Sequence, residues 1–225
     1  MAIFLGLDTA IYPGDNVMKL ARTQANIAFT GFYLGPAPSH PDTGWMKKRT
    51  FLSKLGYGFA PVYVGQQQSG PGSHKISTAQ GVIDGKNAAA LAHAAGFPKA
   101  SVIYLDIENG PPAMPMLLNY YVAWVKAVIG GGFTAGVYCS HLLAAQLLAH
   151  DHRPVPWVFQ LKFSNGHVFT PPLPTPDPSQ SSFSGARVLQ FAQDCTLNLG
   201  TTHLKPLDLN TALVPDPSVA PSSDA

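Results

Sequence analysis

The sequence predicts an α/β protein with a TIM-type barrel, complete or modified, of seven or eight strands. Short apolar runs alternate with helical stretches along the chain, an order typical of parallel strands joined by crossover helices. The length of 225 residues suits one large domain, and a hydrophobic content of 46% supplies a sizeable core and excludes disorder. An open, doubly wound sheet is the alternative that the same alternation allows.

The expected strands are β-branched or aromatic runs bounded by Gly, Pro or Asp. They cover residues 3–7, 28–34, 61–64, 102–107, 134–138, 155–161 and 187–191. The expected helices cover residues 45–55, 79–95, 114–129 and 141–149. The second helix has a clear end, because Gly96 can close a helix in the left-handed conformation and Pro98 cannot continue one.

Two stretches rich in Gly, Pro, Gln and Ser interrupt this alternation and are expected to be loops. They are residues 65–73 (GQQQSGPGS) and 171–178 (PPLPTPDP). The Pro- and Ser-rich end, residues 214–225, is expected to be a disordered tail or linker. Residues 1–213 then form a single barrel domain.

The charge of the sequence is low, since 14 basic and 12 acidic residues give a net charge of +2. No basic tract indicates nucleic acid, and no apolar stretch is long enough to span a bilayer. The first eight residues lack the features of a signal peptide, so export would need another route or a leader outside this sequence.

The two cysteines, Cys139 and Cys195, are too few for a disulfide framework and are expected either to pair or to remain buried thiols. Their spacing is not that of a metal site. In the run His150-Asp151-His152, adjacent side chains point apart and no third ligand is evident. No metal and no cofactor is therefore expected.

The residues with the clearest chemistry are Asp106 and Glu108, at the end of the strand expected over 102–107. Side chains of a strand alternate between its faces, so these two carboxylates share one face and aliphatic side chains occupy the other. Neighbouring, partly buried carboxylates can differ in pKa, one raised and one still ionised, as acid catalysis near neutral pH requires. Helix capping or ion pairing is the alternative role for both.

Other polar residues lie at or near the expected strand ends, which meet at one face of a barrel. They are Asp8, Tyr33, Tyr63, Tyr138, Gln160 and Gln190. A rim of acid, amide and phenol with little positive charge suits a neutral polyhydroxylated ligand, of which carbohydrate is the natural candidate. Each residue also has a structural alternative, since Asp8 could cap a helix and the tyrosines could simply pack.

Two sets of motifs carry a family resemblance. The first is Asp8, Asp106-Ile107-Glu108, Gln190-Phe191 and Asp208-Leu209-Asn210. It resembles family 25 glycoside hydrolases, the bacterial and phage muramidases. The second is Gly6-Leu7-Asp8-Thr9, Phe32-Tyr33-Leu34, Pro61-Val62-Tyr63-Val64, Asp84-Gly85-Lys86-Asn87-Ala88 and Gly136-Val137-Tyr138. It is similar to a sister group, the glycoside hydrolase-like proteins of domain of unknown function 1906.

The resemblance implies a modified TIM-type barrel that hydrolyses a β-1,4-linked amino-sugar polymer, peptidoglycan first. It implies that Glu108 is the general acid and that Asp106 orients it or assists a substrate N-acetyl group. Asp8 and Asp208 are then expected to line the cleft and hold substrate or a water molecule. The expected substrate contacts are Tyr33, Tyr63, Tyr138, Gln160, Gln190 and Asp208.

One departure concerns Leu189, which precedes Gln190 where muramidases often carry Trp, so one sugar contact is missing. The alternative function is a non-catalytic barrel that binds carbohydrate or cell wall and keeps the acidic cleft. In either case the expected partner is a carbohydrate polymer, the expected location is extracytoplasmic or at the cell envelope, and the expected state is a monomer.

Overall fold

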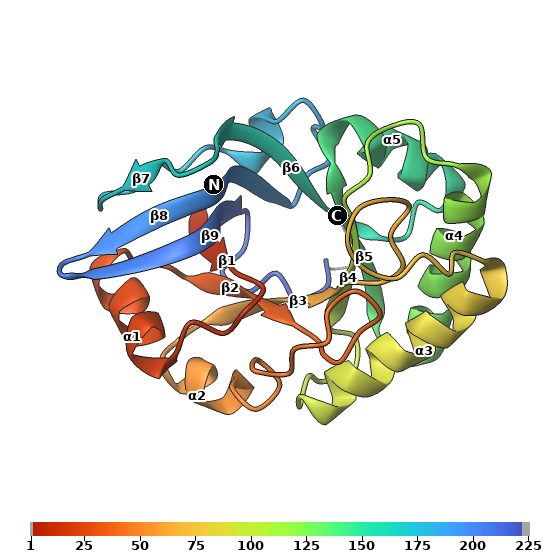
Figure 1. The fold of residues 1–225 in the computed structure, drawn as a ribbon, viewed down its shortest axis with the longest axis horizontal. Coiled ribbons are helices and arrows are strands. Elements are labelled where there is room, and N and C mark those ends of the chain that lie inside the picture. The colour runs from red at the N-terminus through yellow and green to blue at the C-terminus, as the bar shows by residue number, and fades with distance from the viewer. Residues whose placement is uncertain (1, 222–225) are drawn as a thin grey trace.

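Eight strands close into a barrel in the computed structural model, which describes residues 2–221. Going round the ring, they are β1 (Phe4–Asp8), β2 (Phe29–Tyr33), β3 (Gly58–Tyr63), β4 (Val102–Ile107), β5 (Thr134–Ser140), β6 (Val155–Phe163), β8 (Val188–Leu199) and β9 (Thr202–Ala212) (Figure 1). A two-residue strand, β7 (Val168–Phe169), pairs with the outer part of β8. The predicted TIM-type barrel is confirmed.

The barrel is modified at its closing strand. Strands β1 to β6 and β8 run parallel, whereas β9 is antiparallel to both of its neighbours, β1 and β8. The pairings β6–β8 and β1–β9 complete the ring, so the alternative of an open, doubly wound sheet is wrong. Because β8 and β9 are long, their hairpin extends beyond the ring of the barrel (Figure 1).

Helices lie around the outside of the barrel (Figure 1). They are α1 (Asp15–Gln24), α2 (Arg49–Lys54), α3 (Thr78–Ala94), α4 (Pro115–Gly130) and α5 (His141–His150), and a 3-10 turn (Pro178–Gln180) follows β7. Ser77 caps α3 by accepting a hydrogen bond from the amide of Gln80, and Gly96 follows the helix with a φ of 82°. The four helices expected from the sequence are present, with α2 shorter than expected, and α1 was not expected.

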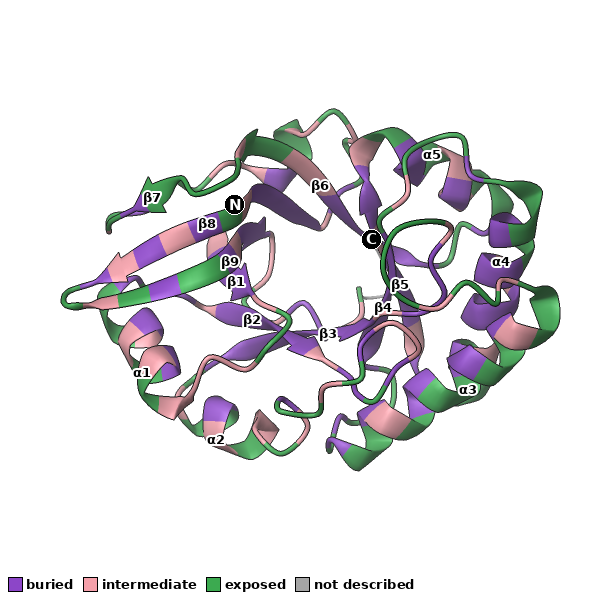
Figure 2. Ribbon diagram, viewed as in Figure 1, coloured by how far each residue is buried: buried purple, intermediate pink, exposed green. Residues whose placement is uncertain are grey.

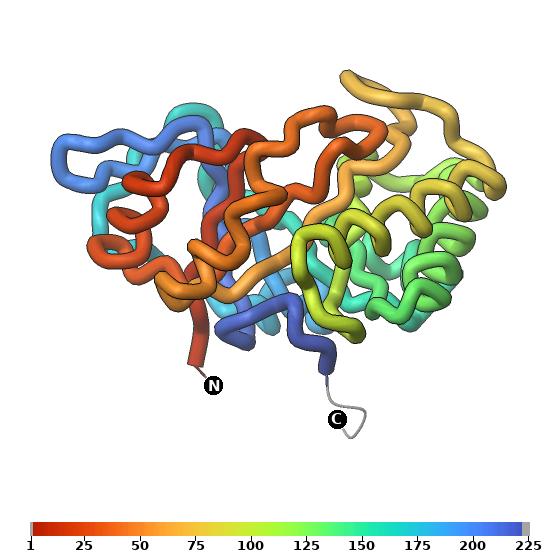
Figure 3. Tube along the Cα trace, turned by 90° about the horizontal axis from the view of Figure 1, so that it is seen from below, coloured from red at the N-terminus to blue at the C-terminus, as the bar shows by residue number. Residues whose placement is uncertain are grey.

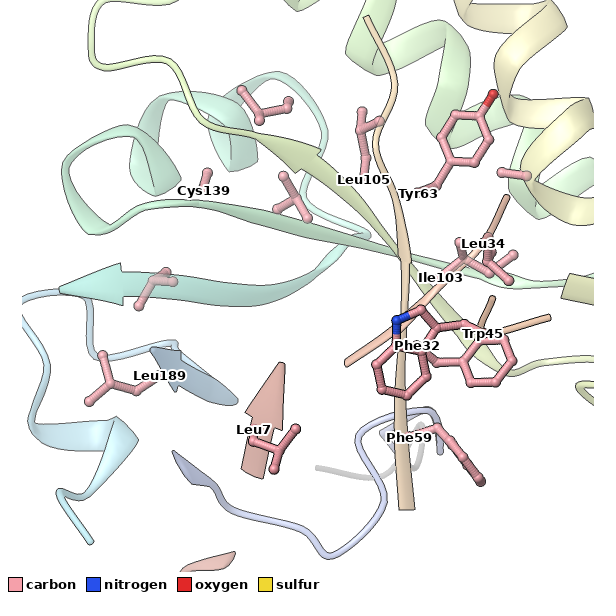
Figure 4. Packing of buried hydrophobic residues seen from close by; sticks show 14 of the residues in the cluster. Leu7, Phe32, Leu34, Trp45, Phe59, Tyr63, Ile103, Leu105, Cys139 and Leu189 are labelled. Atoms are coloured by element: carbon pink, nitrogen blue, oxygen red, sulfur yellow. The ribbon is translucent and has the colours of Figure 1, made fainter. Parts of the chain in front are cut away.

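Hydrophobic residues form two cores, one on each face of the sheet. The outer core lies between sheet and helices and includes Phe32, Trp45 and Phe59, whose side chains lie close together in Figure 4. The inner core fills the barrel and includes Phe29 and Trp157. Buried residues accordingly follow the strands and the inward faces of the helices (Figure 2).

Glycines let large side chains fit inside the barrel. A Cβ atom on Gly136 would lie 2.6 Å from the ring of Tyr104, and one on Gly31 would lie 2.4 Å from the Cβ of Asp8. Real Cβ atoms do not approach other atoms so closely, so a side chain at either position would force its neighbour to move. Gly31 thus leaves the space in which the Asp8 side chain sits.

The segment after β9 packs against the barrel, and the prediction of a disordered tail from residue 214 is wrong for residues 214–221. It crosses the end of the barrel at which β1 begins, the end where both chain termini lie (Figure 3). Asp216 accepts a hydrogen bond from the Phe59 amide, Pro217 accepts one from the Tyr104 hydroxyl, and Ser218 accepts one from the Val102 amide. The tail thus satisfies polar groups at the starts of β3 and β4.

Both cysteines are buried and unpaired, so of the two expected states the structure shows free thiols. Burial raises the pKa of the Cys139 thiol to about 12. Within residues 2–221, no helix combines the length and the apolar character that a membrane span requires.

Candidate active site

Four carboxylates converge at the end of the barrel where the parallel strands finish. Asp8 ends β1, Asp106 lies near the end of β4, and Glu108 follows that strand directly. Asp208 comes from β9 and stands opposite Asp8 in the antiparallel register. Asp8, Asp106 and Glu108 lie here because their strands end here. Asp208 lies in the middle of β9, which runs in the opposite direction, and its pairing with Asp8 brings it to the same end of the barrel.

Asp8 is held by two neutral donors. The Tyr33 hydroxyl donates to its Oδ1 at 2.8 Å, and the Asn210 amide donates to its Oδ2 at 2.7 Å. Asn210 is itself oriented by the Trp157 indole, which donates to the Asn210 Oδ1 at 3.0 Å. Asp8 is only 4% exposed, so these bonds fix its carboxyl in place inside this end of the barrel.

A second chain of hydrogen bonds orients Asp208. The Tyr138 hydroxyl donates to the Oε1 of Gln190 at 2.5 Å, and the Gln190 amide donates to the Oδ2 of Asp208 at 2.8 Å. The backbone amide of Asp194 donates to the other oxygen of Asp208, also at 2.8 Å. Both oxygens of this carboxyl therefore have donors, and the structure brings Gln190 and Tyr138 beside Asp208.

Asp106 differs from these two because its buried Oδ1 has no hydrogen-bond partner within the described chain. Nor does a cation neutralise it, since the two ion pairs among residues 2–221 are Lys48–Asp15 and Arg153–Asp151. A buried carboxylate without donor or cation is costly to ionise. The alternative roles of capping and ion pairing therefore do not fit Asp106.

The pKa values follow from this burial without cations. Desolvation raises the pKa of Asp8 from 3.8 to about 6, although Asn210 and Tyr33 act to lower it. Desolvation and then the charge of Asp8 raise the pKa of Asp208 to about 8. Burial, followed by repulsion from Glu108, Asp8 and Asp208, raises the pKa of Asp106 well above its usual range. The site therefore holds protons at pH values where free carboxyls have lost them.

Glu108 is the most exposed of the four carboxyls and the only glutamate in the sequence. Desolvation and the nearby charge of Asp194 raise its pKa. It borders two hollows. One is a cavity of about 30 Å³ beside Asp106, Tyr138 and Trp157, and the other is a groove of about 410 Å³. Glu108 therefore stands between the buried carboxyls and open space.

The groove lies between the loop after β1 and the β8–β9 hairpin. Its residues include Ile11 and Tyr12 on one side and Asp194 and Lys205 on the other, with Asp8, Glu108 and Asp208 at its base. Its volume falls within the range of about 300–1,000 Å³ typical of ligand sites. A ligand in this groove would meet the carboxyls directly.

Two residues predicted as substrate contacts lie elsewhere. Tyr63 faces outward, where it is fully buried beside Trp124 and donates a hydrogen bond to Asn87. Gln160 forms two hydrogen bonds with Ser182 on the outside of the barrel. The predicted roles of Tyr63 and Gln160 in the cleft are therefore wrong, because the alternation of β3 and β6 turns both side chains away from it.

Asn210, Trp157, Asp194 and Lys205 belong to the site or its groove but had no predicted role. Asn210 had a usable signal, because it lies two residues after Asp208 and thus on the same face of the strand. The described residues contain no group of three or more His, Cys, Asp or Glu side chains arranged to hold a metal ion.

A closed barrel with carboxylates at the carboxyl ends of its strands is an arrangement typical of glycoside hydrolase-like proteins of the TIM type. Residues 21–211 match the family described as the Rv2525c-like, glycoside hydrolase-like domain. The chain belongs to this family, and the resemblance seen in the sequence is confirmed. No significant match was found among curated proteins.

Solved structures with the same fold include a Tat-secreted protein, a lysozyme and an autolysin. The Tat-secreted protein Rv2525c of Mycobacterium tuberculosis, in complex with L-tartrate, superposes with a TM-score of 0.64 at 17% identity over 97% of this chain and 98% of that one. A bacterial lysozyme from Streptomyces coelicolor superposes with a TM-score of 0.60 at 12% identity, over 96% of this chain and 98% of the lysozyme. The autolysin LytC of Streptococcus pneumoniae, in complex with a synthetic peptidoglycan ligand, gives 0.65 at 12% identity over 93% and 46%. The superpositions establish a shared fold, and at identities this low they establish nothing more.

Proposed function

We propose that the protein is a glycoside hydrolase that cleaves a β-1,4-linked amino-sugar polymer, with peptidoglycan as the first candidate. The observation that carries this proposal is the convergence of Asp8, Asp106, Glu108 and Asp208 at one end of the barrel with no cation paired to them among the described residues. Such an arrangement keeps protons on carboxyls near neutral pH, as acid catalysis of glycoside cleavage requires. The lysozyme and autolysin folds among its structural relatives support the choice of substrate.

In this mechanism Glu108 is the general acid. It borders the groove, so it can reach a glycosidic oxygen, and burial raises its pKa in the direction that favours the protonated form an acid needs. Asp106 lies on the same strand face, where it orients the reacting groups or assists the N-acetyl group of the substrate. Asp8, fixed by Tyr33 and Asn210, holds substrate or water at the base of the cleft.

The test is incubation with purified peptidoglycan, with mass analysis of the released fragments. Wild-type protein should release reducing sugars, and Glu108→Gln should lose this activity by a factor of about 100 or more, because it cannot donate the proton. Asp42→Asn, which changes an acid outside the cleft, is the control. Equal activity of Glu108→Gln and wild type would exclude Glu108 as the acid.

The second candidate is a barrel that binds carbohydrate without cleaving it. It is favoured by the narrowness of the innermost cavity, whose volume of about 30 Å³ admits a water molecule but no sugar ring. This candidate predicts measurable affinity for muropeptide or chitin fragments and no turnover. For both candidates we propose a monomer that acts outside the cytoplasm, in line with the Tat-secreted relative and the autolysin.

A further inference from the structure

The loop after β3 carries three consecutive glutamines, Gln66 to Gln68, in the stretch that interrupts the alternation of strands and helices. The ladder between β3 and β4 consists of two register pairs, Val62 with Tyr104 and Tyr63 with Leu105. Asp106 and Glu108 lie beyond its end. On this side of β4, the backbone that carries the two carboxyls therefore needs support from something other than a strand.

Gln67 provides that support. Its side-chain amide donates to the backbone carbonyl of Asp106 at 3.2 Å, in the place where a further ladder bond would form. The backbone of Gln67 is held in turn. Its amide donates to the Ser73 carbonyl at 2.8 Å, and its carbonyl oxygen lies 2.8 Å from Nδ1 of His74. Gln67 is 4% exposed, so water does not compete for these bonds.

Gln68 holds the other side of Glu108. Its backbone amide donates to Oδ1 of Asn109 at 3.0 Å, and Nδ2 of Asn109 donates to the Ser69 hydroxyl at 3.0 Å. The Gln68 side chain also accepts a bond from the Met114 amide at 3.4 Å. Glu108 thus lies between Asp106 and Asn109, both of which are bonded to the glutamine loop.

Gln66 anchors the loop to helix α3. Its side-chain amide donates to Oδ2 of Asp84 at 3.0 Å, and the Tyr120 hydroxyl donates to the same oxygen at 2.8 Å. Its Oε1 accepts a bond from the Lys75 amide at 2.9 Å. Asp84 is 2% exposed, which makes this anchor a buried polar network on the outer face of the barrel.

Glu108 itself has no hydrogen bond to its carboxyl within residues 2–221. Its position is set by the backbone on either side. That backbone is held by β5 on one side, as far as Ile107, and by the glutamine loop on the other. We infer that Gln67 is a positioning residue for Glu108, and that Gln66 with Asp84 fixes the loop from which it acts. This inference rests on the proposed function for its effect on catalysis, while the positioning itself can be measured without turnover.

The first test is Gln67→Met, which keeps the length of the side chain and removes the donor to the Asp106 carbonyl. The matched control is Tyr57→Phe, which removes one buried bond from a hydroxyl to the Met18 carbonyl, away from the site. Amide hydrogen exchange of the peptide 106–114 should speed up roughly tenfold in Gln67→Met and stay unchanged in Tyr57→Phe. Equal exchange in the two variants would overturn the inference.

A second measurement uses the single glutamate. Selective carbon-13 labelling of glutamate in cell-free synthesis gives one side-chain carboxyl signal, whose titration reports the pKa of Glu108 directly. In Gln67→Met this pKa should fall toward 4.5, because a looser segment exposes the carboxyl to water. An unchanged titration would count against positioning. If Gln67→Met does not fold, Asn109→Ala is used instead. It removes the bonds to Gln68 and Ser69 on the other side of Glu108 and should move both readouts in the same direction.

If wild-type protein cleaves peptidoglycan, kcat of Gln67→Met should fall on the order of tenfold with KM within about twofold, because the acid is misplaced while the groove is intact. A purely structural role would lower the amount of folded protein and leave kcat of the folded fraction unchanged, which would overturn the inference. If wild type does not cleave, the proposed function fails, and the exchange and titration results still decide the role of Gln67.

Discussion

Replacing Asp8 by asparagine should remove a pH dependence of stability that this residue imposes on the fold. Burial raises the pKa of Asp8 from 3.8 to about 6, so the folded protein keeps a proton that the unfolded chain releases. The free energy of unfolding therefore falls as pH rises from about 3.8 to about 6, and stays lower above that range. A shift of about two pKa units corresponds to about 3 kcal/mol.

The asparagine side chain of Asp8→Asn cannot ionise, so the variant lacks this loss. The Tyr33 hydroxyl can still donate to the new amide oxygen, but the Asn210 amide loses its acceptor, which costs about 1–3 kcal/mol at every pH. That cost cancels when the variant is compared with wild type at two pH values. The difference in free energy of unfolding between Asp8→Asn and wild type should therefore shift in favour of the variant by about 2–3 kcal/mol from about pH 4 to about pH 7.5.

Urea unfolding followed by circular dichroism at both pH values measures this double difference. Asp42→Asn is the control, because Asp42 lies in a partly exposed turn and its carboxyl accepts a bond from the Gly44 amide. A double difference below about 1 kcal/mol, equal to that of the control, would refute the argument that Asp8 is buried at the cost of its charge.

Two further variants test the packing around the site. Asp216→Ala removes the acceptor of the Phe59 amide and of the Ser218 amide, and should lower the free energy of unfolding by about 1–3 kcal/mol in urea titrations; no change would mean that the tail does not support the barrel. Gly31→Ala places a Cβ atom 2.4 Å from that of Asp8, so it should lower the free energy of unfolding by about 1–3 kcal/mol and change the titration of Asp8 seen by NMR. Stability equal to that of wild type would show that the Asp8 side chain can move to make room.

The site could be predicted from the sequence where the two faces of a strand differ in polarity. In β4 the aliphatic side chains face the helices and Asp106 faces the barrel, as the alternation predicts. In β3 both faces are apolar, so nothing in the sequence tells that Val62 faces inward and Tyr63 outward. The same holds for β6, where Trp157 lies inside and the direction of Gln160 follows only from the register.

The elements that escaped prediction are those stabilised by contacts distant in sequence. Strand β9 contains Lys205 and Pro206, which break its alternation, and the strand is formed by its pairing with β1 and β8. Helix α1 begins after Gly14 without a side-chain cap, so the only local sign of its start is Asp15 in the first turn. The tail has the composition of a linker, yet Asp216 accepts its bond from the Phe59 amide of β3, 157 residues earlier in the chain.

The pKa values of the site bear on which proposed function the structure favours. Four carboxyls lie together here, with Asp8 and Asp106 buried and no cation paired to them within residues 2–221. The values of about 6 for Asp8 and about 8 for Asp208 mean that this arrangement destabilises the fold as pH rises. A barrel that only binds a neutral sugar could use amides and hydroxyls at this place and avoid that cost. An acid catalyst needs carboxyls that keep a proton near neutral pH, and uncompensated burial is the physical means of keeping it there. The unpaired Asp106 is therefore an argument for the proposed hydrolysis over the proposal of binding alone.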